Sequence, residues 1–185
     1  GNGREGQDIS HLYKYISGFP KIKRQDKLAV RGEFIISKDN WDILKKADDT
    51  LSNPRNTVSG AINSKILNKQ LLKMIDIVAY TMVYPNLPNG LSVLDKMKFN
   101  FVNNTVVDDI NLAILSKNLE DSRNNKYVID GIVISDISKV YEIALGKNPE
   151  HSFAFKSIHT LEQVEVIVKE VEWNISKDKY MKPIV

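Results

Sequence analysis

The alternation of apolar and polar residues predicts two long strands in the first half of the chain. Over residues 27–37, apolar side chains fall on one face while Arg31 and Glu33 share the opposite face, because successive residues of a strand point to opposite sides. Residues 77–84 are uncharged and rich in β-branched and aromatic side chains, which is typical of a buried strand. The face of this strand that we expect to be buried holds Val78, Tyr80, Met82 and Tyr84.

Helices are predicted where apolar residues recur every three to four positions after a residue that can cap a helix. Gly18 and Pro20 end the first predicted helix, and Ser37 or Asp39 caps the second. The expected helices cover residues 8–17, 37–47, 53–60, 69–76, 91–99 and 108–123. Shorter strands are expected over residues 127–135, 152–157 and 164–175. Because no repeat or linker divides these elements, the pattern predicts one α+β domain.

The composition excludes several classes of protein. Of the 185 residues, 42% are hydrophobic and 26% are charged, which suits a globular domain with a single core rather than a disordered chain. The chain has no cysteine, so it holds neither a disulfide bond nor a thiolate-bound metal, and a reducing compartment is the natural expectation. The long uncharged stretch over residues 77–94 is broken by Pro85, Pro88 and Gly90, so no membrane-spanning helix is expected.

The net charge of +3 gives only a weak indication of a nucleic-acid partner. The chain has 21 lysines but 5 arginines, and arginine is the residue that binds phosphate through two parallel hydrogen bonds. Lysine, isoleucine and asparagine are all frequent here and are all encoded by A- and T-rich codons, so a biased genome explains the same surplus. Charge alone therefore leaves the question of a nucleic-acid partner open.

Two further patterns have ordinary explanations. Residues 1–6 match the dinucleotide motif G-x-G-x-x-G, but no strand precedes them and no βαβ unit is expected after them, so a Rossmann fold is not favoured. A glycine-rich turn with amides that face an anion stays open. His11, His151 and His159 show no metal-ligand spacing, so no metal site is expected.

Four short segments become informative when they are taken together in their order along the chain. Each alone is typical of a solvated strand, a turn or a hairpin corner. Together with the glycine-rich start, they resemble the adenylation domain of NAD-dependent DNA ligases, a branch of the covalent nucleotidyltransferases. The resemblance covers nearly the whole chain, and its Lys- and Asn-rich composition is similar to that of ligases from large DNA viruses. The segments are Val30-Arg31-Gly32-Glu33, Asn53-Pro54-Arg55-Asn56, Asp130-Gly131-Ile132-Val133-Ile134 and Phe153-Ala154-Phe155-Lys156.

This resemblance implies a fold and a site. The fold is α+β, with antiparallel sheets and flanking helices, as in the covalent nucleotidyltransferases. Glu33 and Lys156 are implied to be catalytic, and Glu33, Arg55, Arg123 and Lys156 are implied to bind the nucleotide. A carboxylate accepts hydrogen bonds from ribose hydroxyls, and cations offset the charge that develops in phosphoryl transfer. The implied cofactors are NAD, through its AMP moiety, and Mg²⁺.

The resemblance also implies a reaction and its partners. Ligases of this family seal nicks in duplex DNA in three steps: NAD adenylates an enzyme lysine, AMP passes to a 5′-phosphate, and the 3′-hydroxyl closes the nick. Nicked duplex DNA is therefore the expected partner, and no membrane is expected. The implied protein is a monomer with further domains, located inside the cell in the cytoplasm, the nucleus or a viral factory.

The sequence departs from the family pattern at several positions. The family's Lys-x-Asp-Gly motif, which provides the lysine nucleophile, does not occur in these 185 residues, so we expect them to form no covalent intermediate alone. The segment Asp130-Gly131-Ile132-Val133-Ile134 resembles the family's motif IV, and Ser135 stands where that motif ordinarily ends in lysine, with Lys139 nearby. Asn63 stands where the family has a second arginine, with Lys65 nearby.

Two hypotheses follow from this comparison. In the first, residues 1–176 are a partial adenylation domain of an active ligase, and residues 177–185 begin the passage into an oligonucleotide-binding domain. In the second, the chain is a diverged, catalytically inert domain that binds nucleotide or DNA. The presence of Glu33, Arg55 and Lys156 favours the first hypothesis.

Overall fold

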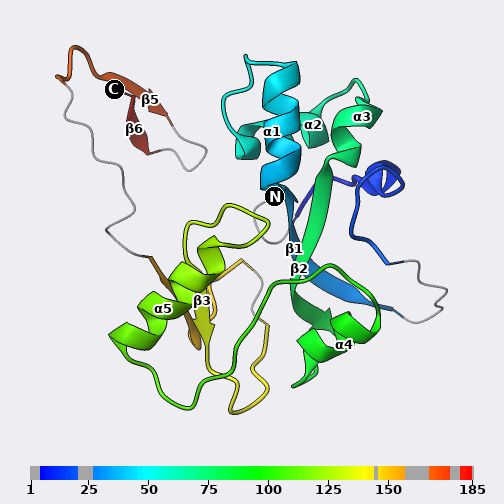
Figure 1. Cartoon of the computed structure of the whole chain (residues 1–185), viewed down its shortest axis with the longest axis vertical. Coiled ribbons are helices and arrows are strands. Elements are labelled where there is room, and N and C mark those ends of the chain that lie inside the picture. Colours follow the sequence, from blue (N-terminus) through cyan, green and yellow to red (C-terminus); the bar gives the residue numbers. More distant parts are fainter. Residues whose placement is uncertain (1–4, 21–26, 144–145, 157–166, 176–179, 185) are drawn as a thin grey trace.

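Two antiparallel strands, β1 (Ala29–Ile36) and β2 (Ile75–Tyr84), form the sheet at the centre of the molecule (Figure 1). The computed structural model describes residues 5–20, 27–143, 146–156, 167–175 and 180–184. Gly32 pairs with Ala79 and Arg31 pairs with Thr81, so Tyr80 is an additional residue in β2, a β-bulge. The bulge places both Tyr80 and Thr81 on the face of the sheet that bears Arg31.

The two faces of this sheet differ in polarity. Residues that pair directly across the strands share a face, so Glu33, Asp76 and Tyr80 lie on the same side as Arg31. The opposite side is apolar and is covered by two clusters of buried side chains. The first cluster contains Leu12, Ile16, Ile36, Val58, Leu72 and Ile75, and the second contains Ala79, Met82 and Leu94.

Three helices lie at one end of the sheet: α1 (Lys38–Ala47), α2 (Pro54–Asn63) and α3 (Lys69–Lys73) (Figure 1). Each begins after a residue whose side-chain oxygen accepts a hydrogen bond from the backbone N–H three positions later. These caps are Ser37, Asn53 and Asn68, and each contributes about 1 kcal/mol to its helix. The short helix α4 (Gly90–Lys96) packs against the other end of β2 and contributes Leu94 to the second cluster.

The second half of the chain forms smaller units. Helix α5 (Leu112–Arg123) begins at the cap Asn111 and lies against the sheet of β3 (Ile132–Ser135) and β4 (Ser152–Phe155) (Figure 1). The hairpin of β5 (Glu172–Ile175) and β6 (Met181–Ile184) is exposed along its whole length and lies apart from the other elements (Figure 1). The fold is thus a mixture of helices and small antiparallel sheets, as the α+β prediction requires.

The structure confirms the two long strands and the helices that follow Ser37 and Asn53, but several predicted bounds are wrong. The helix predicted over 8–17 is only the 3₁₀ turn Ser10–Leu12, which we label η1, and the helix predicted over 108–123 begins at its Asn111 cap. The helix predicted over 69–76 ends at Lys73, because β2 already begins at Ile75. The strands predicted over 127–135, 152–157 and 164–175 are also shorter in the structure: β3 begins at Ile132, β4 ends at Phe155, and β5 begins at Glu172. Residues 1–4, 157, 159, 164–166 and 176–177, on which other predictions fell, lie outside the described part.

Candidate functional site

Glu33 lies exposed on the polar face of the β1–β2 sheet, as its position in the strand predicts. The neighbouring Gly32 allows β1 and β2 to approach closely next to the bulge. A Cβ atom at Gly32 would lie 2.8 Å from the carbonyl oxygen of Val78, which is closer than a methyl group tolerates. The Arg31-Gly32-Glu33 segment therefore needs its glycine for packing, and the Glu33 side chain on the other face of the strand is exposed to solvent.

Tyr80 is a residue that the sequence analysis assigned wrongly. It was predicted to share a buried face with Val78 and Met82, yet 43% of it is exposed: Val78 pairs with Glu33, so Val78 and Tyr80 lie on the polar face, and the bulge after Tyr80 places Met82 on the opposite, apolar face. Tyr84, predicted on the same buried face, is also exposed at 58%. A bulge leaves no mark in a regular alternation, so the pattern could not reveal that Tyr80 and Met82 lie on opposite faces.

Arg55 lies in the first turn of α2, where the Asn53 cap fixes the start of the helix. Its guanidinium nitrogen Nη2 lies 3.3 Å from the Asp130 carboxylate oxygen Oδ2, which joins two of the four motifs. Both side chains are exposed, at 78% for Arg55 and 63% for Asp130, so the pair contributes at most about 1 kcal/mol to folding. Its importance is geometric, because it places a cation beside motif IV.

Lys156 lies directly against motif IV. In the β3–β4 sheet Ile132 pairs with Phe155, so the next pair along would be Gly131 and Lys156. A Cβ atom at Gly131 would lie 2.6 Å from the carbonyl oxygen of Phe155 and 2.8 Å from Cγ of Lys156. The glycine therefore makes room for the lysine side chain, and the structure brings the segments of Arg55 and Lys156 each into contact with Asp130-Gly131.

Arg123 is the last residue of α5. Its carbonyl oxygen accepts a hydrogen bond from the ammonium of Lys38 (2.7 Å), and the backbone N–H of Lys38 donates to the carbonyl of Lys126 (2.9 Å). The start of α1 thus holds the end of α5. Arg123 is linked to the Arg55–Asp130 pair through residues 124–129, which run from α5 to Asp130.

Ser135, Lys139 and Asn63, which lie where the sequence departs from the family pattern, all interact with residues close to them in the structure. The Oγ atoms of Ser135 and Ser152 lie 2.8 Å apart across the strand pair. Lys139 lies over the ring of Tyr141, 5.0 Å from its centre, and Tyr141 donates a hydrogen bond to Asp136. That bond, with a backbone one from residue 138, lowers the pKa of Asp136 to about 2. Likewise, the Asn63 amide donates to the carbonyl of Ser59, one turn back in its own helix.

A buried carboxylate in β2 also escaped the sequence analysis. Asp76 is only 8% exposed, and its Oδ2 accepts hydrogen bonds from Lys126 Nζ and from the Tyr127 hydroxyl, both at 2.8 Å. The Asp76 carboxylate raises the pKa of Lys126, and burial raises the pKa of Tyr127. A charged residue inside the apolar run Ile75–Val78 is the available signal, but helical spacing predicts Asp76 at the end of a helix rather than inside a strand.

The candidate residues thus form two groups, an exposed carboxylate and an aromatic ring on the β1–β2 sheet, and two cations next to Asp130-Gly131. Such a set suits a nucleotide, whose hydroxyls need an acceptor, whose base stacks on aromatic rings and whose phosphates need cations. In the described ranges, no three His, Asp or Glu side chains converge on a metal position, and no helix has the length and apolar character of a transmembrane segment.

Comparison with known proteins agrees with the class that this site suggests. Residues 1–158 match the family described as the NAD-dependent DNA ligase adenylation domain, and the chain belongs to this family. It is 35% identical over 191 residues to a DNA ligase of Acanthamoeba polyphaga mimivirus, and the aligned region covers 99% of this chain and 29% of that protein. The resemblance to ligases, including viral ones, that the motifs indicated is confirmed.

Further relatives come from viruses and bacteria. The putative DNA ligase 205R of Invertebrate iridescent virus 6 is 32% identical over 199 residues, covering all of this chain and 31% of that protein. A DNA ligase of Lactobacillus delbrueckii subsp. bulgaricus is 27% identical over 202 residues, covering 99% of this chain and 30% of that protein. The chain thus spans about three tenths of the length of these relatives.

Proposed function

We propose that this chain forms the nucleotide-binding part of an NAD-dependent DNA ligase that seals nicks in duplex DNA. The observation that supports this most strongly is the meeting of Arg55, Asp130 and Lys156. These residues belong to three motifs that are separated by 75 positions and then by 26, and chance surface residues have no reason to converge. Two cations thus lie next to Asp130-Gly131, an arrangement that supports the holding of an adenylate while its phosphate reacts.

Each site residue has a role that its position supports. We propose that Glu33 accepts hydrogen bonds from ribose hydroxyls and that the half-exposed ring of Tyr80 stacks on the adenine. Arg55 binds a phosphate through its guanidinium, while Lys156 stabilises the negative charge that develops on the transferring phosphoryl group. Arg123, at the end of α5, completes the positive side of the site. NAD, when bound, supplies the adenylyl group.

Mg²⁺ belongs to this proposal only as a partner of phosphates. Among the described residues, no cluster of carboxylates and imidazoles forms a cage for a divalent cation. Mg²⁺ commonly retains water and binds through one or two protein ligands together with substrate phosphates, so a cage is not required. We therefore assign no residue of this chain to the metal.

The exposed β5–β6 hairpin fits the proposed domain organisation. It lies beyond the 158 residues that match the family and exposes Trp173, Ile175 and Met181, which are 59%, 74% and 55% accessible. A two-stranded hairpin with exposed apolar residues is marginal by itself and gains stability when further strands pack on it. We propose that residues 1–176 belong to the adenylation domain and that the chain passes into an oligonucleotide-binding domain from residue 177.

The diverged, inert domain is the second candidate, and Ser135 is the observation that favours it. The full-length protein with NAD labelled in its AMP moiety distinguishes the two. A ligase becomes labelled on a lysine, whereas an inert domain stays unlabelled. Labelling by ATP but not by NAD would place the protein outside this chemistry.

The 185-residue chain alone should remain unlabelled in the same assay, because it contains no Lys-x-Asp-Gly sequence to provide the nucleophile. Denaturing electrophoresis after incubation with labelled NAD measures this directly, with the full-length protein as the positive control. A labelled lysine within residues 1–185 would show that another side chain acts as the nucleophile.

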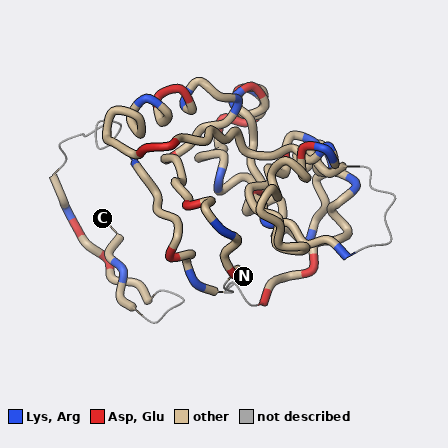
Figure 2. Tube along the Cα trace, turned by 90° about the horizontal axis from the view of Figure 1, so that it is seen from below, with Lys and Arg blue, Asp and Glu red and all other residues tan. Residues whose placement is uncertain are grey.

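We also expect the 185-residue chain to bind duplex DNA weakly and in a salt-sensitive manner. Figure 2 shows acidic and basic positions interspersed along the trace rather than gathered on one side, and exposed lysines contact DNA through its phosphates. Raising the salt concentration from 50 to 200 mM should therefore weaken binding by at least about tenfold, as measured by fluorescence anisotropy. Affinity that is independent of salt would contradict a phosphate-based contact.

A further inference from the structure

The Asp76 carboxylate is buried in the sheet at a cost that its contacts only partly explain. A buried charge is unfavourable unless it is paired, and a buried ion pair is seldom more stable than apolar residues of the same size. Asp76 is paired twice, with Lys126 and Tyr127 at 2.8 Å each, yet stability alone gives little reason to place a carboxylate there. This arrangement points to a role in fixing the geometry of the chain.

The pairing fixes a segment that has no regular secondary structure of its own. Residues 124–131 belong to no helix or strand. Besides the two contacts with Asp76, the carbonyl of Lys126 accepts from the backbone N–H of Lys38 at 2.9 Å. The Tyr127 hydroxyl accepts from the Asn100 amide at 3.0 Å, which also donates to the carbonyl of Ile77. Three elements therefore hold Lys126 and Tyr127 in place: β2, the start of α1 and the loop after α4.

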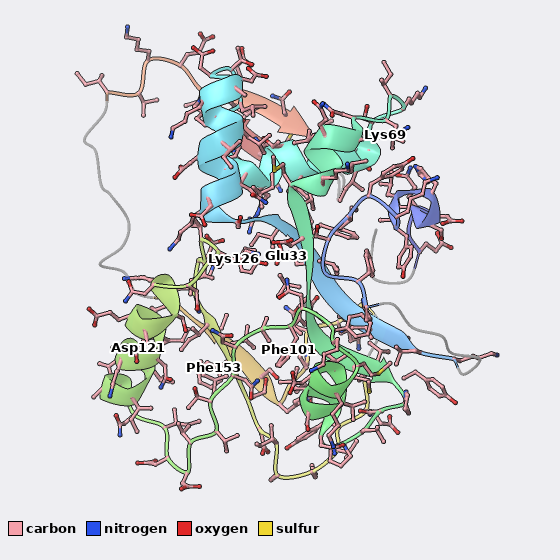
Figure 3. The ribbon with its side chains drawn as sticks, turned by 45° about the vertical axis from the view of Figure 1, so that its right-hand side comes forward. Glu33, Lys69, Phe101, Asp121, Lys126 and Phe153 are labelled. Atoms are coloured by element: carbon pink, nitrogen blue, oxygen red, sulfur yellow. The ribbon has the colours of Figure 1, made fainter. Side chains whose placement is uncertain are left out.

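This fixed point lies close to the proposed site along the chain. Asp130 follows Tyr127 by three residues, a span of about 10 Å at most. Its carboxylate then meets Arg55 in an exposed pair that is weak on its own. Asp76 also lies on the same sheet face as Glu33, and Figure 3 shows Lys126 and Glu33 in the same region of the molecule.

We propose that Asp76 is a positioning residue that holds residues 126–130 so that Asp130 meets Arg55 in the geometry that binds the nucleotide. This inference rests on the proposed function, because Arg55 is one of the groups proposed to bind the adenylate. Asp76 acts through Lys126 and Tyr127 and contacts no substrate. The exposed Arg55–Asp130 pair gains its fixed geometry from the buried anchor.

The test is a double-mutant cycle in the full-length protein, with NAD as the substrate. Asp76→Asn should raise KM for NAD about tenfold while kcat changes less than threefold, because charged hydrogen bonds that hold a binding group are lost. In the Arg55→Ala background, the same substitution should raise KM less than twofold, since the group that Asp76 positions is absent. If the two substitutions acted independently, the fold-increase in KM of the double variant would instead be the product of the increases in the two single variants.

Controls separate positioning from loss of stability. Tyr127→Phe keeps both charges, removes one hydrogen bond to Asp76, and should raise KM about threefold with the same dependence on Arg55. Leu94→Val, in the cluster with Ala79 and Met82, should lower the melting temperature and leave KM unchanged. An unchanged KM in Asp76→Asn and Tyr127→Phe, or effects that multiply with Arg55→Ala, would overturn the positioning role alone. Failure of the unmodified protein to react with NAD would overturn the proposed function and this inference with it.

Discussion

Replacing Lys156 with alanine in the full-length protein is expected to slow self-adenylation by NAD about 100- to 1,000-fold, the usual cost of losing one group that stabilises transition-state charge. Lys156 lies against Gly131, the residue next to Asp130 of the Arg55–Asp130 pair, and the proposed function assigns its ammonium to the phosphate of the nucleotide. The measurement is the single-turnover rate at saturating NAD. The melting temperature should change little, because Lys156 is exposed.

Lys139→Ala is the matched control for this variant. Lys139 lies over the Tyr141 ring in the loop after β3, so its removal should change the rate less than threefold. If Lys139→Ala were as slow as Lys156→Ala, Lys139 would be the cation that replaces the missing motif IV lysine. A rate in Lys156→Ala within threefold of the unmodified protein would remove Lys156 from the proposed chemistry.

The second large effect is an expected gain. Ser135→Lys should raise the rate of adenylation about 10- to 100-fold, because it restores a cation where relatives of this family ordinarily have one. The β3–β4 register places Ser135 on the same face as Val133, and this face continues to Gly131 and Lys156. Val133 is 72% exposed, so a longer side chain at Ser135 has room to extend along this face.

Ser135→Ala provides the control for the gain. It removes the hydrogen bond between Ser135 and Ser152 without adding a charge, and the rate should stay within twofold. A Ser135→Lys variant that is no faster than the unmodified protein would show that the site has adapted to the serine. Activity that appears only in Ser135→Lys would identify the natural sequence as the diverged, inert form.

The sequence predicted the parts of the fold that follow from periodicity and caps. The alternation around Glu33 and the caps Ser37 and Asn53 have direct counterparts in β1, α1 and α2. Helix ends were less predictable, because a strand that begins at Ile75 takes residues that helical spacing also suits. Tertiary contacts, and not local preference, decide which structure forms there.

Residues of the candidate site that belong to a sequence motif could be predicted, whereas residues whose role depends on three-dimensional contacts could not. Arg55 and Lys156 were named from their motifs, and the structure adds that both lie beside Asp130-Gly131. The separation of Tyr80 and Met82 onto opposite faces depends on one extra residue in β2, and the importance of Asp76 depends on partners 50 and 51 positions away. Neither the bulge nor the long-range contacts of Asp76 produce a periodic pattern of apolar residues, so a single sequence does not reveal them.

The contact between Gly131 and Lys156 couples the lysine that we propose to be catalytic to the opening of a small sheet. Lys156 is held beside motif IV only while β3 and β4 are paired, and this sheet has four residue pairs. Local opening of such short strands costs less free energy than global unfolding. Each opening would carry Lys156 away from the phosphate while Glu33 remains in the longer β1–β2 sheet. If Lys156 acts as proposed, we therefore expect hydrogen exchange to be faster in β3 and β4 than in β1 and β2.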